Sequence, residues 1–208
     1  MKEQNLTEKE SLEIITRMIQ QTKQNFQLGS GNIFLCYGYT SVILSLLVYF
    51  LCYFTSSLAW HNLWFLMFVP MIYEKISRKK SKNIVVTYTD KAVHNVWNVI
   101  NALFILTVIT MCVIGYINEI LILIPMLPLA LLYVGIGTAC TGVIMNEKSM
   151  TYFPIISFVI SIYMLLHLLV NESFGIEWNL LGGLSFFTML VIPGHVLNRK
   201  SLKQCSKN

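Results

Sequence analysis

The segment VHNVWNVINALFILTVITMCVIGY, residues 93–116, decides the fold class of this chain. It contains no Lys, Arg, Asp or Glu. One helix crosses the hydrocarbon core of a bilayer with about 20 mostly apolar residues, and this segment is long enough to do so. The segment therefore predicts a transmembrane helix.

The rest of the chain has the same character. Of its 208 residues, 55% are hydrophobic and only 12% are charged, whereas a soluble domain carries about 25% charged residues. We therefore expect an all-α, polytopic integral membrane protein. Its six transmembrane helices are predicted at Asn32–Phe54, His61–Lys75, Val93–Tyr116, Ile120–Met145, Thr151–Val170 and Trp178–Leu197.

The first 31 residues are the longest polar stretch. Thr7 and Glu10 form a capping box, which predicts a helix start. Apolar residues then recur at helical spacing from Leu12 to Phe26, with polar residues between them. We expect a cytoplasmic amphipathic helix that ends at Gly29-Ser30-Gly31. It would lie on the membrane surface, pack beneath the bundle or pair with a partner.

The basic residues predict the orientation. With the amino terminus inside, all 15 Lys and Arg fall in residues 1–31, in the loops after the second and fourth helices, and in a basic tail at 199–208. The outer loops carry Glu119, Glu172 and Glu177 instead. Because positive residues remain on the cytoplasmic side, we expect both termini there. The membrane domain would then be residues 32–198.

Four segments carry a resemblance. They are GSGNIFLCYGY at 29–39, VTYTDK at 86–91, GIGTACTG at 135–142 and IPGHVLN at 192–198. Together they resemble a group of small six-helix inner-membrane proteins of gut-type anaerobic bacteria, over nearly the whole chain. The resemblance implies a bacterial inner membrane. It implies no activity and no site residue, because the group has no assigned function.

Polar residues inside the apolar segments are the candidate functional residues. His94, Asn98 and Asn101 fall at i, i+4 and i+7, so they share one helix face. They predict either interhelical hydrogen bonds or the wall of a polar pocket open to the cytoplasm, completed by Thr138 and Thr141. The other polar residues near this depth are His195, Glu74, Asp90 and Asn198.

The fourth helix has a face of small residues. Gly135 and Ala139 form one small-xxx-small pair, and Thr138 and Gly142 form another, which predicts close helix packing. Pro125 and Pro128 predict a kink in the outer half of this helix.

The histidines and cysteines do not predict a cofactor. His61 and His167 fall toward the outside, and His94 and His195 toward the inside, so we expect interfacial hydrogen bonding in preference to haem or metal binding. No CxxC, GxSxG or HExxH motif occurs.

The outer turns contain an internal similarity. Trp60-His-Asn-Leu-Trp64 is similar to Glu177-Trp-Asn-Leu-Leu181, and the even-numbered helices end alike. Three copies of a helical hairpin would explain these similarities, and so would the general requirement for charge at inner helix ends.

A basic cluster follows the second predicted helix. Beside a membrane helix, such a cluster predicts orientation and contact with anionic lipid in preference to nucleic acid. Its members are Arg78, Lys79, Lys80 and Lys82.

Three functions remain open, and a non-enzymatic one is favoured. A carrier or channel requires the His94–Asn101 face and the two threonines to line a water-filled cavity. A regulatory or scaffold protein would pack them dry and present the Leu12–Phe26 helix to a partner. A lipid-modifying enzyme requires Glu74, Asp90 and His195 to converge. No helix carries a charged residue in mid-span, which argues against ion-coupled transport.

Overall fold

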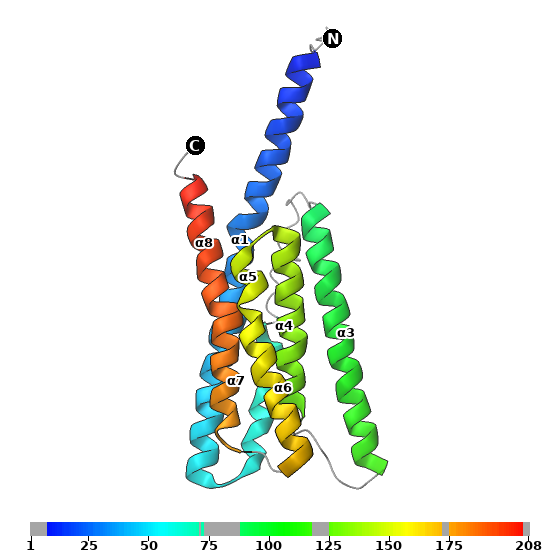
Figure 1. Ribbon diagram of the computed structural model, residues 1–208, viewed down its shortest axis with the longest axis vertical. Helices are drawn as coiled ribbons and strands as arrows, with labels where there is room; N and C mark the ends of the chain where they lie inside the picture. Colours follow the sequence, from blue (N-terminus) through cyan, green and yellow to red (C-terminus); the bar gives the residue numbers. More distant parts are fainter. Residues whose placement is uncertain (1–7, 71, 73–87, 118–124, 172–174, 206–208) are drawn as a thin grey trace.

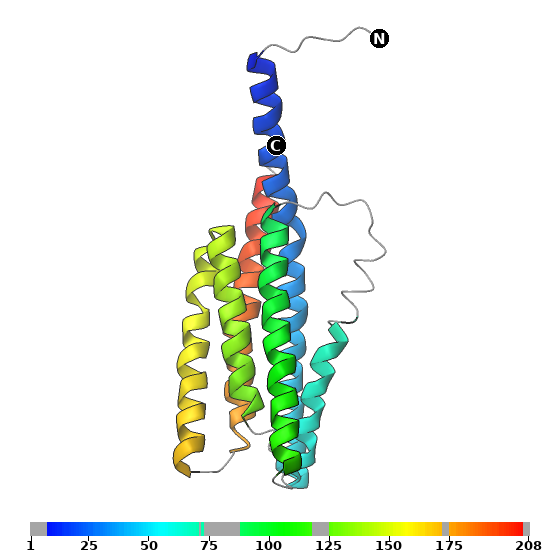
Figure 2. The same cartoon turned by 90° about the vertical axis from the view of Figure 1, so that its right-hand side faces the viewer.

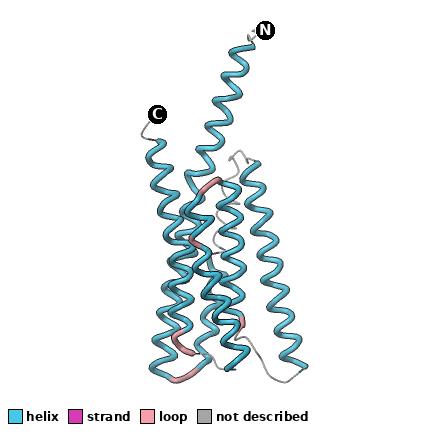
Figure 3. Tube along the Cα trace, in the orientation of Figure 1, coloured by secondary structure: helices cyan, strands magenta, loops and turns pink. Residues whose placement is uncertain are grey.

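The computed structural model describes residues 8–70, 72, 88–117, 125–171 and 175–205, and no β-strand occurs among them. Helices run nearly parallel to one another in one elongated bundle (Figures 1 and 3). The elements are α1 (Glu8–Thr55), the 3₁₀ helix η1 (Leu58–Met67), α3 (Tyr88–Ile117), α4 (Met126–Met145), α5 (Lys148–Tyr152), α6 (Pro154–Asn171), α7 (Trp178–Phe186), the π-helix η2 (Phe187–Val191) and α8 (Ile192–Cys205).

Among the described residues, five segments are long and apolar enough to cross a membrane, which supports a multi-pass membrane protein. The expected second span, His61–Lys75, is not among them. Its described part is mostly the ten-residue η1, and residues 71 and 73–75 lie outside the described residues. The five segments are Gly31–Thr55, Tyr88–Ile117, Met126–Met145, Lys148–Val170 and Trp178–Lys200.

The two ends of the bundle differ in what they contain. The start of α1, the end of α8 and the α4–α5 turn lie at one end, here called the terminal end (Figures 1 and 2). The turn at Ser56 and the starts of α4 and α7 lie at the opposite end, here called the far end. Helix α1 packs along α8, α7 and η1, whereas α3 packs mainly on α4.

The helix break expected at Gly29–Gly31 is wrong. Helix α1 is continuous from Glu8 to Thr55 and extends beyond the other helices (Figure 1). Gly31 instead lets α8 approach. A Cβ there would collide with the side-chain oxygen of Asn198 and lie 3.1 Å from the carbonyl oxygen of Gly194. Gly31 therefore marks a close helix contact and does not interrupt the helix, since a helix tolerates glycine at a modest energetic cost.

The prolines act differently from the expected kink. Pro125 is the N-cap of α4, and Pro128 lies in its first turn, where backbone N–H groups have no helical acceptor to lose. Pro193 has the larger effect. It cannot donate to Met189, and the helix widens just before it into the π-helix η2, where Ile192 N–H bonds to the carbonyl of Phe187. Helix α8 then continues into the predicted basic tail, to Cys205.

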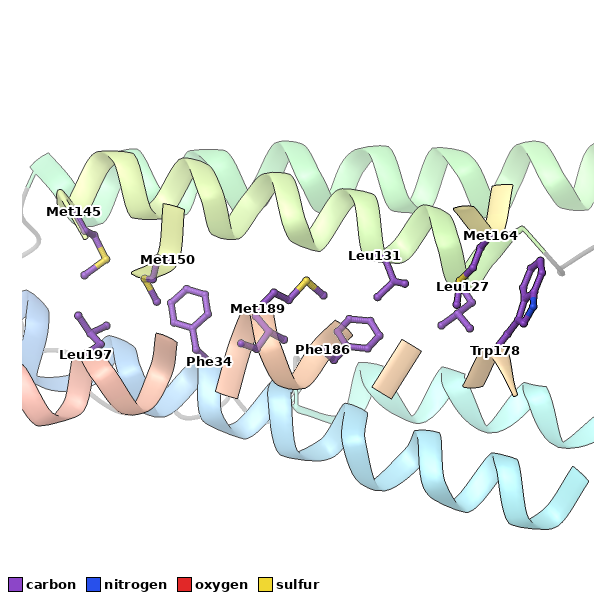
Figure 4. Close-up of a cluster of buried hydrophobic side chains, with 11 residues drawn as sticks. Phe34, Leu127, Leu131, Met145, Met150, Met164, Trp178, Phe186, Met189 and Leu197 are labelled. Carbon is purple, nitrogen blue, oxygen red and sulfur yellow. The ribbon is translucent and has the colours of Figure 1, made fainter. Parts of the chain in front are cut away.

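The core is rich in methionine. Met150 of α5, Met164 of α6 and Met189 of η2 are fully buried, and they belong to one buried hydrophobic cluster that also contains aromatic side chains (Figure 4). Flexible thioethers fill irregular gaps between helices that differ in local geometry. Only Ile100 and Gly115 of α3 are buried, so α3 lies at the edge of the bundle.

Candidate functional site

A buried polar cluster joins three elements near the far end. Asn179, in the first turn of α7, is fully buried. Its side-chain oxygen accepts from Trp64 Nε1 at 3.1 Å. Its side-chain nitrogen lies 3.1 Å from His61 Nε2 and donates to the carbonyl of Ile176, also at 3.1 Å. We call Asn179, Trp64, His61 and Ser45 the Asn179 cluster.

Helix α1 enters the cluster through Ser45. The Ser45 hydroxyl donates to the backbone carbonyl of Asn179 at 2.5 Å. A Cβ on Gly183 would collide with that hydroxyl, so the contact requires glycine one turn along α7. Cys52 of α1 lies 3.8 Å from His61 Nδ1, within the reach of a weak sulfur hydrogen bond. The cluster therefore ties α1 and η1 to α7.

The hydrogen-bonding capacity of Asn179 is nearly used up. An amide offers two donors and two acceptor positions. Both donors and one acceptor position are engaged within the protein. In a membrane interior, such satisfied amides hold helices together. The arrangement therefore acts as a brace, with little capacity left for a polar ligand.

The hydrogen bonding of His167 differs from that of His61. The Nδ1 atom of His167 is buried and has no hydrogen-bond partner among the described residues. Its ring meets Trp178 edge-on, with the ring centroids 5.2 Å apart. The aromatic contact accounts for the position of the ring on α6.

The predicted polar pocket residues lie in two different environments. His94 and Asn98 are exposed on α3, and Asn101 is half-buried. Thr138 and Thr141 are fully buried, and their hydroxyls donate to the carbonyls of Val134 and Gly137, four residues earlier in α4.

Trp97 makes the contact between α3 and α4 at this depth. Its indole N–H donates to the hydroxyl of Thr141 at 3.2 Å. The same ring lies 3.3 Å from where a Cβ on Gly137 would be, so it covers that glycine. The structure therefore brings a tryptophan to the threonines, and does not bring His94 or Asn98 there.

The small-residue face of α4 contacts two neighbours. A Cβ on Gly135 would lie 2.8 Å from the Phe158 ring of α6. A Cβ on Gly142 would lie 2.6 Å from the backbone nitrogen of Thr151 in α5. Ala139 is half-buried between them. Glycine at 135 and 142 thus permits backbone approaches of the kind that small-xxx-small pairs provide.

The remaining predicted residues do not form one site. His195 Nε2 lies 2.7 Å from the Tyr39 hydroxyl of α1. Asp90 is in the first turn of α3. Asn198 donates to the side chain of Asn32 at 2.8 Å. Glu74 and the basic cluster at 78–82 lie outside the described residues.

An ion pair at the terminal end was missed by the sequence reasoning. Glu147 is largely buried, and Lys200 Nζ lies 2.5 Å from its carboxylate. The pair links the α4–α5 turn to α8. The Glu-Lys sequence at 147–148 suggested only a helix boundary, because the partner lies 53 residues away.

The contacts described for these residues are hydrogen bonds, aromatic contacts and the Glu147–Lys200 ion pair. Among the described residues, no group of three or more His, Cys, Asp or Glu is arranged to hold a metal ion.

Searches of protein-family models, curated proteins and solved structures found no match to the chain.

The Asn179 cluster had one signal in the sequence. Its members His61, Trp64 and Asn179 all come from the two similar outer turns. Folding brings those two turns into contact with each other. Ser45 gave no signal, since a lone serine in an apolar helix looks the same whether or not it reaches another helix.

Proposed function

We propose that this chain is a non-enzymatic, multi-pass protein of the bacterial cytoplasmic membrane that acts as a regulatory or scaffold protein. The amino-terminal part of α1 would bind the partner. One observation carries the proposal: α1 continues as a helix beyond the bundle (Figure 1), and apolar side chains are exposed there. Leu12 is 64% exposed and Ile14 is 41% exposed. Exposed apolar side chains on a projecting helix are typical of helix-mediated recognition.

The packing within the bundle supports this proposal over a carrier. A carrier requires polar side chains facing a wet cavity. The buried hydroxyls of Thr138 and Thr141 bond to their own helix, and Trp97 covers Thr141. The amide of Asn179 is engaged with its neighbours.

The charges support an orientation with both termini in the cytoplasm and six crossings. Every Lys and Arg among the described residues lies in the amino-terminal half of α1, in the first turn of α3, at the start of α5 or in the last turns of α8. These segments all lie toward the terminal end (Figure 1). Glu177, which precedes α7, lies at the far end. This asymmetry follows the positive-inside rule. The remaining crossing would be supplied by the part of the chain between α1 and α3, which contains η1.

The proposal is tested by photo-crosslinking in intact cells. A photoreactive residue replaces Glu13, between Leu12 and Ile14. We expect one discrete protein adduct, which the double variant Leu12→Asp and Ile14→Asp reduces at least fivefold and the matched control Thr16→Ala leaves unchanged. Adducts with lipid alone would instead identify a helix lying on the membrane, and would overturn the proposal.

A further inference from the structure

A surface groove on α8 has features that the proposed function does not use. It has a volume of about 330 Å³ and is lined by Ile192, His195, Val196 and Arg199. These residues fall at i, i+3, i+4 and i+7, so they form one continuous stripe along the helix. The stripe is apolar at one end and cationic at the other.

The groove lies at the depth of a lipid headgroup and the first part of its acyl chain. Helix α4 has 20 residues, which gives a length of about 30 Å, equal to a bilayer core. Lys200, next to Arg199, contacts Glu147 just after α4 ends. Arg199 therefore lies at the membrane boundary. Ile192 lies seven residues earlier, about 10 Å deeper in the hydrocarbon region.

Charge at the boundary is left available for a ligand. Lys200 is paired with Glu147. Arg199 is exposed and has no ion pair with any described residue. A planar guanidinium binds phosphate oxygens through two parallel hydrogen bonds.

The histidine of the groove is held in place from α1. The Tyr39 hydroxyl lies 2.7 Å from His195 Nε2, and the two rings meet edge-on. When Tyr39 donates this hydrogen bond, the histidine proton is on Nδ1, which gives the groove a second donor.

We propose that this groove binds an anionic phospholipid. Its phosphate contacts Arg199 and His195, and the first part of an acyl chain lies along Val196 and Ile192. The proposed site does not include the basic segment at 78–82, which lies outside the described residues. The proposal depends on the membrane location of the bundle, and does not depend on a protein partner for α1.

Native mass spectrometry of the full chain tests whether the charge of Arg199 contributes to lipid binding. Phosphatidylglycerol and phosphatidylcholine of equal chain length are added in detergent. We expect preferential retention of phosphatidylglycerol, and Arg199→Gln should lower it by about five- to tenfold. Lys148→Gln removes an exposed charge at the same end of the bundle and should change retention by less than twofold. Equal losses in the two variants would indicate a nonspecific charge effect and would overturn the site.

A second pair of variants tests the groove. Val196→Trp fills the apolar part and should lower retention severalfold while Arg199 remains in place. Val143→Trp is the matched control, because Val143 is 67% exposed on α4 at a similar depth, and it should leave retention unchanged. Glycerol 3-phosphate, which has the phosphate without acyl chains, should not displace the lipid at equal concentration. If it displaces the lipid, the groove binds free phosphate and the lipid proposal fails.

Discussion

Asn179 makes several hydrogen bonds near the far end. Its amide and its backbone carbonyl engage Trp64, His61, Ile176 and Ser45. In lipid, water does not compete for these groups, yet each interhelical hydrogen bond contributes only about 0.6 kcal/mol on average. The contribution of Asn179 to stability therefore comes from the number of hydrogen bonds that its amide makes.

Replacing Asn179 with Ala should destabilise the protein measurably. The change removes three side-chain bonds and takes away the acceptor of the partly buried Trp64 N–H. We expect a loss of roughly 2 kcal/mol, and therefore an apparent Tm about 4–8 °C lower in detergent. Asn98→Ala is the control, because Asn98 is exposed on α3, and it should shift the Tm by less than 1 °C on the same scale. Equal shifts would show that the cluster does not brace the bundle.

At the scale of single residues, the sequence identified candidate polar side chains within the helices. It was less successful in predicting which residues contact each other. The His94, Asn98 and Asn101 stripe had the correct periodicity, because helical spacing is a local property. The side of α3 that meets α4 carries Trp97, whose ring contacts Gly137 and Thr141, and Thr107, whose hydroxyl lies 2.7 Å from that of Tyr133. Periodicity alone contains no information about that choice.

At the scale of elements, glycine and proline were the residues interpreted least well. Gly29-Ser30-Gly31 suggested a break, but α1 continues through it because Gly31 packs against α8. Pro125 and Pro128 suggested a kink, but they lie where α4 begins. Glycine and proline each occur where a helix breaks, kinks, begins or packs closely. The position of the neighbouring helix determines which of these is present.

The continuity of α1 predicts a measurable distance. Spin labels at Thr16 and Thr40 are separated by 24 residues of helix, which corresponds to about 36 Å between backbones. Pulsed electron paramagnetic resonance should give a narrow distribution near that value, broadened only by the label linkers. A broad distribution at shorter distances would mean that the helix is interrupted near Gly31. As a control, labels at Val99 and Val113 on the exposed side of α3 should give about 21 Å.

At the scale of the whole molecule, composition and charge predicted the class of protein. Scarce charge and long apolar segments indicated a multi-pass membrane protein, and five of the expected segments correspond to helices of sufficient length. The second segment was the shortest predicted one, and its described part is mostly a 3₁₀ helix. Hydropathy measures whether residues suit lipid, and it does not distinguish a full crossing from a shorter apolar segment.

The orientation of the bundle yields the last prediction. Ser56 lies in the turn between α1 and η1 at the far end, and Lys148 begins α5 at the terminal end. In a cysteine-free background, Ser56→Cys should react with a membrane-impermeant maleimide added to intact cells. Lys148→Cys should react only after the membrane is opened, because basic residues remain on the cytoplasmic side. Reaction of Lys148→Cys from outside, with Ser56→Cys protected, would invert the orientation. The segment of α1 proposed to bind a partner would then lie outside the cell, so this labelling also decides on which side of the membrane such a partner must be sought.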